Sequence, residues 1–415
     1  MSPPGPEAAR GAREAARSAV DRSRADLVRL SESIHSRPEL CFEEHHAAGA
    51  VAEVLAGGGF SVETGIFDLP TAVRATAGSG PLSVVICAEY DALPGVGHAC
   101  GHNLIAASAV GAGLALAGLA DEAGLTVTVL GTPAEEGGGG KVFLLDRGAF
   151  AGAHAAMMVH PWPEDRLGAD CLAVDHVRIR YTGREAHASA APERGINAGD
   201  ALVVAQTAIG LLRQHLRPGN QVHGFVESGG EAPNIVPRNA SGRWMIRARS
   251  LEDLGELRPR ILHCFEAGAL ATGASLAVED LAPTYTHMEQ DPELLGLWRR
   301  NAEELGRRYP ADDEGTPSPT VSTDMANISL ALPSIHPLIG IETGGAVNHQ
   351  PEFTAACLGS SAEQAIFDGA VGMAWTALDA AAGPDLRARL LARTLPPTDP
   401  GSFRRDVDAV IDPSL

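Results

Sequence analysis

The chain has little lysine, few aromatic residues and no closely paired cysteines. Lys141 is its only lysine, and the other 31 of the 32 basic residues are arginines. Phe, Trp and Tyr together make up 4% of the 415 residues. The six cysteines are scattered and form no Cys-x-x-Cys pair. Such a chain is not a disulfide scaffold, and the pattern is typical of a reducing compartment.

Positive charge is also in deficit. The chain carries 32 basic and 52 acidic residues, a formal net charge of −20, which excludes a broad surface for nucleic acid or anionic membranes. Residues 1–24 lack the apolar core of a secretory signal. The most apolar stretch, residues 104–120, is shorter than the about 20 residues that span a bilayer, so we expect a buried helix there. These features predict a soluble, cytoplasmic protein.

Length and periodicity predict a two-domain α/β protein. A domain takes about 100–200 residues. Apolar runs typical of strands buried on both faces of a sheet alternate with helical stretches before residue 170 and after residue 287. We expect residues 25–170 and 287–395 to form a catalytic α/β domain with a mostly parallel sheet. Residues 1–24 read as a frayed arm, and about the last 20 residues, which are rich in Pro and Asp, as irregular.

Residues 171–286 have a different hydrophobic pattern. Their strand patterns alternate like half-exposed strands, and two helical stretches separate them. The order of these elements is βαββαβ, which is the ferredoxin-like unit. We therefore expect an antiparallel two-layer domain inserted within the α/β domain.

The segment CAEYDALPGVGHACGHN, residues 87–103, lies where a buried strand ends and a helix begins. Ligand sites of open α/β sheets gather at the carboxyl ends of strands. Cys100 and His102 are two residues apart, so an extended loop turns both side chains the same way. Thiolate and imidazole suit a borderline-soft divalent ion such as Zn²⁺. Taken alone, the pair is better explained as a buried thiol beside a structural histidine.

The segment GTPAEEGGGGK, residues 131–141, follows the next buried strand. Glu135 and Glu136 are adjacent, so one carboxylate can bind a metal while the other accepts and donates a proton. The structural alternative is an acidic turn exposed to solvent. A phosphate-binding loop is excluded, because Val142 stands where that motif has Ser or Thr after its lysine.

Two histidines are further candidate metal ligands. His160 ends a short apolar strand, and His349 follows a flexible Gly-Gly pair. Each alone is more simply a structural residue. Together with Cys100, His102 and Glu136 they supply five N, O and S ligands, enough for two ions with one ligand shared.

These segments resemble the metallopeptidase family of aminoacylase, carboxypeptidase and the amino-acid amidohydrolases. The resemblance covers about residues 27–385, with six segments in the same order, IHSRPELCFEE and STDMANIS among them. It is closest to the amidohydrolase branch, in its p-aminobenzoyl-glutamate hydrolase and β-alanyl-dipeptide hydrolase members.

The resemblance implies roles for these residues. Cys100 would bridge two divalent ions, Zn²⁺ or Mn²⁺; His102 and His160 would complete one site, and Glu136 and His349 the other. Glu135 would be the general acid and base, and Asp91 would orient a metal-bound imidazole or the base.

The inserted domain resembles the family's lid and dimerisation domain. His187 would stabilise the tetrahedral oxyanion, reaching the active site of the partner subunit in a homodimer. Asn234 and Arg247 would contact the substrate, because the guanidinium fork of arginine binds a carboxylate in a bidentate manner. A loop histidine, a strand-end cap and a surface arginine are their structural alternatives.

Two positions depart from the branch. Asn103 stands in place of the usual Asp after Cys-Gly-His, which removes a negative charge near the predicted metals. The branch has Arg-Ala-Asp before the orienting Asp, whereas this chain has Ala88-Glu89-Tyr90. Glu89 occupies the place of a metal-binding His in other branches, and we interpret it as a support for the ligands. Ser322, Thr323 and Asp324 form a polar loop that faces the substrate or supports the metals.

The sequence therefore predicts a metal-dependent amidohydrolase that cleaves the amide bond of N-acyl or aminobenzoyl amino acids or small dipeptides. An aminoacylase or carboxypeptidase of different specificity is one alternative. A non-catalytic binding descendant of the fold is another.

Overall fold

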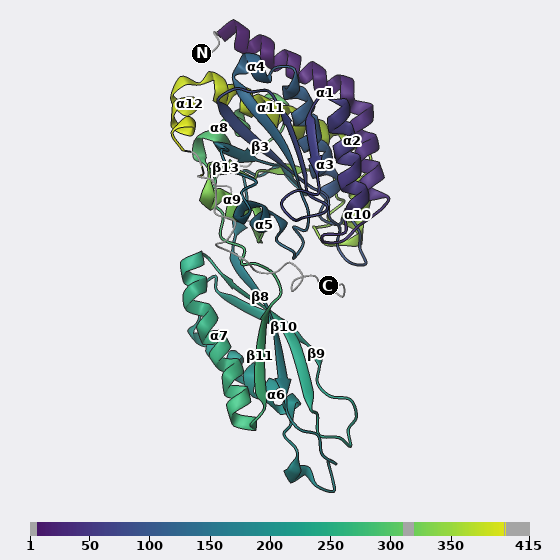
Figure 1. Cartoon of the computed structure of the whole chain (residues 1–415), viewed down its shortest axis with the longest axis vertical. Coiled ribbons are helices and arrows are strands. Elements are labelled where there is room, and N and C mark those ends of the chain that lie inside the picture. Colours follow the sequence, from purple (N-terminus) through teal and green to yellow (C-terminus); the bar gives the residue numbers. More distant parts are fainter. Residues whose placement is uncertain (1–5, 310–318, 394, 396–415) are drawn as a thin grey trace. The chain divides into compact units, whose positions relative to one another are not determined.

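The computed structural model describes residues 6–309, 319–393 and 395. They form two compact units. The first unit consists of two segments, the chain up to Asp170 and the chain from Met288 onward. The second unit is Cys171–His287. Each unit is described by itself below (Figure 1).

The first unit is built on a six-stranded sheet of order β1-β2-β4-β3-β5-β13. The pairs β3–β4, β3–β5 and β5–β13 are parallel, whereas β1–β2 and β2–β4 are antiparallel. This mainly parallel sheet confirms the predicted α/β class. The strands are β1 Ser61–Thr64, β2 Val73–Ala77, β3 Leu82–Glu89, β4 Leu125–Thr132, β5 Ala155–Met157 and β13 Ser334–Ile335.

Helices cover both faces of this sheet. Val84 and Ile86 of β3 pack into one hydrophobic core, whereas Val85 and Cys87 pack into another, as the alternation of strand side chains requires. The larger core includes the helices α1 Pro6–His35, α2 His45–Gly57, α3 His102–Ala117, α8 Pro292–Glu304 and α11 Ser360–Ala382. The smaller core includes α5 Gly140–Asp146 and α9 Met325–Ala331.

The prediction of a frayed arm over residues 1–24 is wrong for the part described. Helix α1 begins at Pro6 and packs against α3 and α11 (Figure 1). Ala16 and Val20 are fully buried on its inner side. The many arginines and glutamates that suggested a solvated arm lie on an amphipathic helix with a narrow apolar stripe. The first unit therefore begins before residue 25.

Helix α3 occupies the apolar stretch of the sequence and is buried along almost its whole length. Its small residues allow close packing: a Cβ added at Gly111 would lie 2.8 Å from the Cβ of Ala370 on α11. Among the described residues, no helix is both long enough and apolar enough to cross a membrane.

The second unit has the expected βαββαβ order. Its antiparallel sheet has the order β11-β8-β10-β9, which leaves β9 at one edge. Both helices contact each other and the central strands β8 and β10. Asn197 and Ser250 cap the two helices through side-chain oxygens. The elements are β8 Ala173–Thr182, α6 Ala198–Leu212, β9 Gln221–Ser228, β10 Asn239–Ala248, α7 Leu251–Thr272 and β11 Ser275–Asp280.

Short elements complete the described chain. They are α4 Ala120–Ala123, β6 His160–Trp162, β7 Asp170–Cys171, η1 Pro192–Arg194, η2 Arg213–His215, β12 Thr320–Val321, β14 Leu338–Gly340, α10 Pro351–Ala356 and α12 Pro384–Leu391.

Candidate metal centre

The candidate site lies at the carboxyl ends of β4, β3 and β5, which are neighbours in the sheet. Parallel strands end at the same edge, so the loops that follow them meet there. The loop after β3 carries Asp91 and Cys100 and leads into His102 at the start of α3. The loop after β4 carries Glu135, and His160 begins β6 shortly after β5.

The five predicted ligands come together in two groups that share one residue. Cys100, His102 and His160 form one group, and Cys100, Glu136 and His349 form the other. Within each group, one ligand atom per residue lies within 4.8 Å of the others. The Sγ atom of Cys100 lies 3.4 Å from Nε2 of His160, and Nε2 of His349 lies 3.5 Å from Oε1 of Glu136. A thiolate shared in this way can serve two ions.

Asp91 fixes which nitrogen of His102 faces these ligands. Its Oδ1 lies 2.9 Å from Nδ1 of His102, and its Oδ2 accepts the backbone N–H of Glu136 at 2.8 Å. In the described part of the chain, Nε2 of His102 has no hydrogen-bond partner. Carboxylate oxygens surround it, from Glu89 at 3.5 Å and from Glu135 and Glu136 at 3.9 Å. A cation fits such a set of electron-pair donors, so these residues suit a divalent metal.

The electrostatics of the cluster favour the same conclusion. Burial raises the pKa of Cys100 well above its usual value, and the charge of Glu136 adds to this. Burial lowers the pKa of His160 to about 4, so its imidazole is neutral. A neutral imidazole is ready to bind a metal, whereas this thiol becomes a thiolate only beside a cation.

Glu135 lies on a tightly held loop. It groups with His102 and Glu136 in the buried interior, and burial together with the charge of Glu89 raises its pKa well above the usual value. The preceding residue, Ala134, has φ of 59°, a conformation that is strained for a residue with a side chain. Such strain is found where the surrounding structure over-determines the backbone.

Glu44, which sequence reasoning missed, is one of the residues that hold this loop. Its Oε1 accepts the backbone N–H of Ala134 and of Phe42, both at 2.9 Å, and its Oε2 accepts the hydroxyl of Thr71 at 2.7 Å. Burial, with Asp91 nearby, raises the pKa of Glu44 to about 8. The signal that could have found it is its place in the segment IHSRPELCFEE, which carries part of the family resemblance.

His336 is a second residue that the sequence did not indicate. It is buried, and its ring meets that of His160 edge-on with a centroid distance of 5.5 Å. Burial lowers the pKa of His336 to about 3. It thus packs as a neutral ring behind a predicted ligand.

A buried ionic cluster lies beside the predicted ligands. The ammonium of Lys141 pairs with Oδ1 of Asp324 and lies 2.5 Å from Oε1 of Glu89, and all three side chains are fully buried. Glu89, Glu135 and Asp324 also form a group whose geometry could hold a cation. The supporting position predicted for Glu89 and Asp324 agrees with these contacts, but the sequence did not indicate Lys141. The one feature of the sequence that could have drawn attention to Lys141 is that it is the only lysine of the chain.

Asn103, the residue that departs from the branch, is fully buried at the start of α3. Its Nδ2 donates to the hydroxyl of Ser31 at 2.9 Å and to the carbonyl of Cys357 at 3.2 Å. The side chain therefore joins α1 to the turn after α10.

The three predicted residues of the second unit lie at two ends of its sheet. Arg247 pairs with Val174 near the end where the chain enters this unit. His187 bridges to Ile235 beyond the opposite end, where the backbone of Ala188 also bonds that of Asn234 at 3.0 Å. Figure 1 shows these loops extending past the ends of β8 and β10. His187 and Asn234 are thus brought together, and Arg247 is not brought to them.

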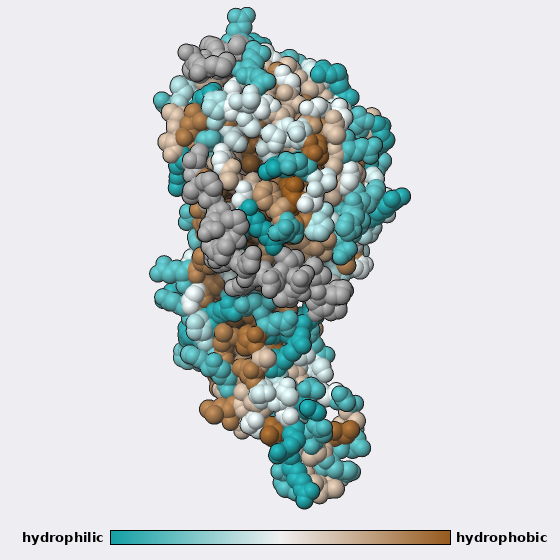
Figure 2. All heavy atoms as spheres, in the orientation of Figure 1, coloured by the Kyte–Doolittle hydropathy of each residue, from teal (hydrophilic) through white to brown (hydrophobic). Residues whose placement is uncertain are grey.

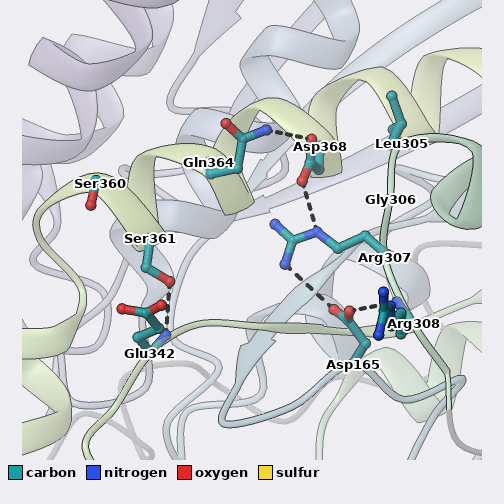
Figure 3. Close-up of a pocket in the computed structure, with 10 residues that line it drawn as sticks. All are labelled: Asp165, Leu305, Gly306, Arg307, Arg308, Glu342, Ser360, Ser361, Gln364 and Asp368. Carbon is teal, nitrogen blue, oxygen red and sulfur yellow. Dashed lines mark hydrogen bonds and ion pairs between the residues drawn. The ribbon is translucent and has the colours of Figure 1, made fainter.

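The first unit also has a surface hollow of about 600 Å³ (Figure 3). Arg307 lies at its centre, with Nε 2.7 Å from Asp368 and Nη1 3.5 Å from Asp165. None of the residues lining it belongs to the four groups above. These ion pairs join α11 to the segments after α8 and β6.

The α/β sheet carries a strand-end cluster of Cys, His and Glu that could hold metal ions, and comparisons with known proteins identify the chain as a hydrolase of amide bonds. The family model "Peptidase family M20/M25/M40" matches residues 85–364, and the chain belongs to this family. It is 38% identical over 382 residues to the Xaa-Arg dipeptidase of Mus musculus, covering 88% of each chain. It is 31% identical over 275 residues to a p-aminobenzoyl-glutamate hydrolase chain of Escherichia coli, covering 61% of this chain and 57% of that one.

Solved structures share the fold. A dinuclear metal-binding M20 peptidase of Bacillus subtilis superposes with a TM-score of 0.63 at 21% identity, covering 86% of this chain and 98% of that one. The predicted family, the α/β class and the activity as an amide hydrolase are confirmed at this level.

Proposed function

We propose that the enzyme binds two divalent ions through Cys100, His102, His160, Glu136 and His349. The observation that supports this most is that Cys100 belongs to both groups of ligands. When bound, a pair of such ions polarises the amide carbonyl and lowers the pKa of water. Thiolate and imidazole favour Zn²⁺, while the carboxylate and metal availability leave Mn²⁺ as the alternative.

Glu135 is the proposed proton carrier. It lies beside the ligands without belonging to either group that contains Cys100. Its carboxylate accepts a proton from the attacking water and then donates it to the leaving amine. Asp91 holds His102 and the backbone of Glu136 so that the two groups keep their relative position.

The proposed substrate is a small dipeptide or an N-acylated amino acid with a free carboxylate. Arg247 supports this, because the guanidinium binds a carboxylate with two hydrogen bonds. Its Nε donates to Nε2 of His223 at 3.1 Å, and burial lowers its pKa. The names of the relatives suggest Xaa-Arg dipeptides and p-aminobenzoyl-glutamate as the first compounds to assay.

A substrate panel on metal-reconstituted enzyme tests this function. The apo-protein is loaded with Zn²⁺ or Mn²⁺, its metal content is measured, and hydrolysis of Xaa-Arg dipeptides, β-alanyl dipeptides, p-aminobenzoyl-glutamate and N-acetyl amino acids is compared. We expect two ions per chain and activity on one of these classes that disappears with chelation. Fewer than two ions per chain after reconstitution overturns the dinuclear assignment. Activity only on longer peptides overturns the substrate class.

We further propose that the active enzyme is a homodimer in which the partner supplies His187 and Asn234. Eight residue steps separate Asn239 from Arg247 along β10, a length of about 26 Å. One small substrate cannot reach both ends of this sheet. The arrangement is resolved if the two ends of the sheet serve two different active sites of a homodimer, so that Arg247 and His187 of one chain contact different substrate molecules.

The surface of the second unit supports this assembly. Strand β9 lies at the edge of the sheet, and Phe225 and Val226 on it are 59% and 41% exposed. Of the twelve exposed large hydrophobic side chains among the described residues, eight lie in this smaller unit. Figure 2 shows such residues, in brown, at its surface. An exposed apolar edge strand favours pairing with a second copy about a two-fold axis.

Mixing two inactive variants tests the shared site. His187→Ala and Arg247→Ala homodimers each lack one component in every site. After subunit exchange, half of the dimers are mixed and one of their two sites is intact, so activity returns to about a quarter of the wild-type value. If both residues served the same chain's site, mixing would restore nothing.

We also propose a cytoplasmic location. Cys100 must remain a reduced thiolate to bind metal, and Cys41, Cys87, Cys264 and Cys357 are free thiols as well. Fractionation that places the enzyme in an oxidising compartment overturns this.

A further inference from the structure

We propose that Lys141 is a built-in cation that keeps Glu89 out of the metal coordination, and so limits the centre to its five ligands. Lys141 is thus a positioning residue that acts through Glu89. This inference rests on the dinuclear centre proposed above.

Lys141 is fixed from two directions. Its backbone N–H donates to Oδ2 of Asp324 at 2.8 Å, while its ammonium pairs with Oδ1 of the same carboxylate and with Oε1 of Glu89. It lies at the start of α5, directly after the glycine loop that carries Glu135. The fully buried ammonium therefore has one defined position between the end of β3 and the start of α9.

Glu89 stands close enough to the predicted ligands to compete with them. Its Oε2 lies 3.5 Å from Nε2 of His102, the nitrogen left available for a metal ion by the contact of Nδ1 with Asp91. Its other oxygen lies 2.5 Å from the ammonium of Lys141. A carboxylate in this place is a suitable ligand for a divalent ion unless another cation already holds it.

A group of three acidic residues beside the predicted ligands shows that the ammonium of Lys141 takes the place of a metal ion. Glu89, Glu135 and Asp324 have the geometry of a cation site, and Lys141 contacts two of the three. Three buried carboxylates without a cation would be strongly destabilising. Either a metal ion or an ammonium can supply the charge, and the ammonium is covalently attached, so it does not depend on metal supply.

The choice of lysine fits this role. The chain uses arginine at 31 of its 32 basic positions and lysine only here. A guanidinium is planar and wide, whereas an ammonium is a compact point charge that fits between two carboxylates as a metal ion does.

Co²⁺ substitution tests the inference, because its visible absorption depends on the number and type of ligands. We expect Lys141→Met to release Glu89, which then joins the coordination and changes the Co²⁺ spectrum of the reconstituted protein. We also expect kcat to fall about tenfold or more, with KM changed less than about threefold. The double variant Glu89→Gln/Lys141→Met removes both charges and restores the wild-type spectrum. Glu89→Gln alone leaves Lys141 paired with Asp324 and keeps that spectrum.

The outcomes separate this inference from the proposed function. Wild-type protein that binds two ions, together with a Lys141→Met spectrum identical to wild type, overturns the inference alone. Wild-type protein that binds fewer than two ions overturns the dinuclear centre. If Lys141→Met does not fold, a crystal structure of the metal-loaded wild type decides: Glu89 on Lys141 supports the inference, and Glu89 bound to an ion overturns it.

Discussion

Asp91 and His102 form a buried pair in which the carboxylate Oδ1 lies 2.9 Å from the imidazole Nδ1. The second oxygen of Asp91 holds the backbone N–H of Glu136 at 2.8 Å. One carboxylate thus connects the loop after β3 with the loop after β4. Because those loops carry proposed ligands of both groups, Asp91 is placed to orient the proposed centre through His102 and the backbone of Glu136.

Replacing Asp91 with Asn is therefore expected to weaken metal binding about 10–100-fold. The amide offers one acceptor oxygen in place of two, so either His102 or the N–H of Glu136 loses its partner. Competition with a chromophoric chelator measures the affinity. Asp385→Asn changes the same residue type at an exposed position of α12 and serves as the control. Equal affinity in the two variants would contradict the orienting role.

Glu135 and Glu136 are adjacent in sequence, but they have different proposed roles and provide controls for each other. Glu135→Gln is expected to keep its two ions while kcat falls about 10²–10⁴-fold, because an amide cannot carry the proton. Glu136→Gln is expected to lose metal content as well as activity. Metal analysis and steady-state kinetics on both variants check this. Loss of metal from the Glu135 variant would assign that residue to coordination.

Local patterns in the sequence predicted the residues that follow strand ends. Cys100, Glu135 and His160 were proposed because each lies on a segment that follows an apolar run, and the edge of a parallel sheet brings such segments together. The pairing of Lys141 with Asp324 spans 183 residues, and nothing local in either segment specifies it. The burial of Ala16 and Val20 was missed for a related reason, because a two-residue stripe becomes visible only when α3 and α11 are present to cover it.

Asn103 gives a stability prediction that concerns its departure from the family branch. Asn103→Asp replaces a buried donor to the carbonyl of Cys357 with an acceptor, so we expect a loss of about 1–3 kcal/mol in the free energy of unfolding. Ser31→Ala removes only one of the two bonds and is expected to cost less. Urea denaturation of both variants measures the difference. An unchanged Asn103→Asp protein would show that the pocket rearranges to accept an acid.

A pH-dependent contribution to stability comes from Asp291, far from the proposed ligands in sequence. Both its oxygens accept hydrogen bonds from Arg389 at 2.8 Å, and Oδ1 also caps α8 at Leu294. Burial acts to raise the pKa of Asp291, but the bonds from Arg389 and Leu294 outweigh it and lower the pKa below the usual value. The ionised carboxylate therefore stabilises the folded state more than the unfolded one.

This contribution is fully present above the pKa of an unfolded aspartate, about 3.9, and is lost as pH falls through the lower folded value. Asp291→Asn keeps a cap for α8 but removes the charge that Arg389 needs, so we expect a loss of about 1.5–3 kcal/mol at pH 7. The gap between wild type and variant should stay constant from pH 7 to about pH 5 and shrink below about pH 4. Urea transitions of the metal-free proteins across this range measure it. Arg389→Met should show the same acid dependence, and a gap that widens toward acid would contradict the assignment of the shift to this pair.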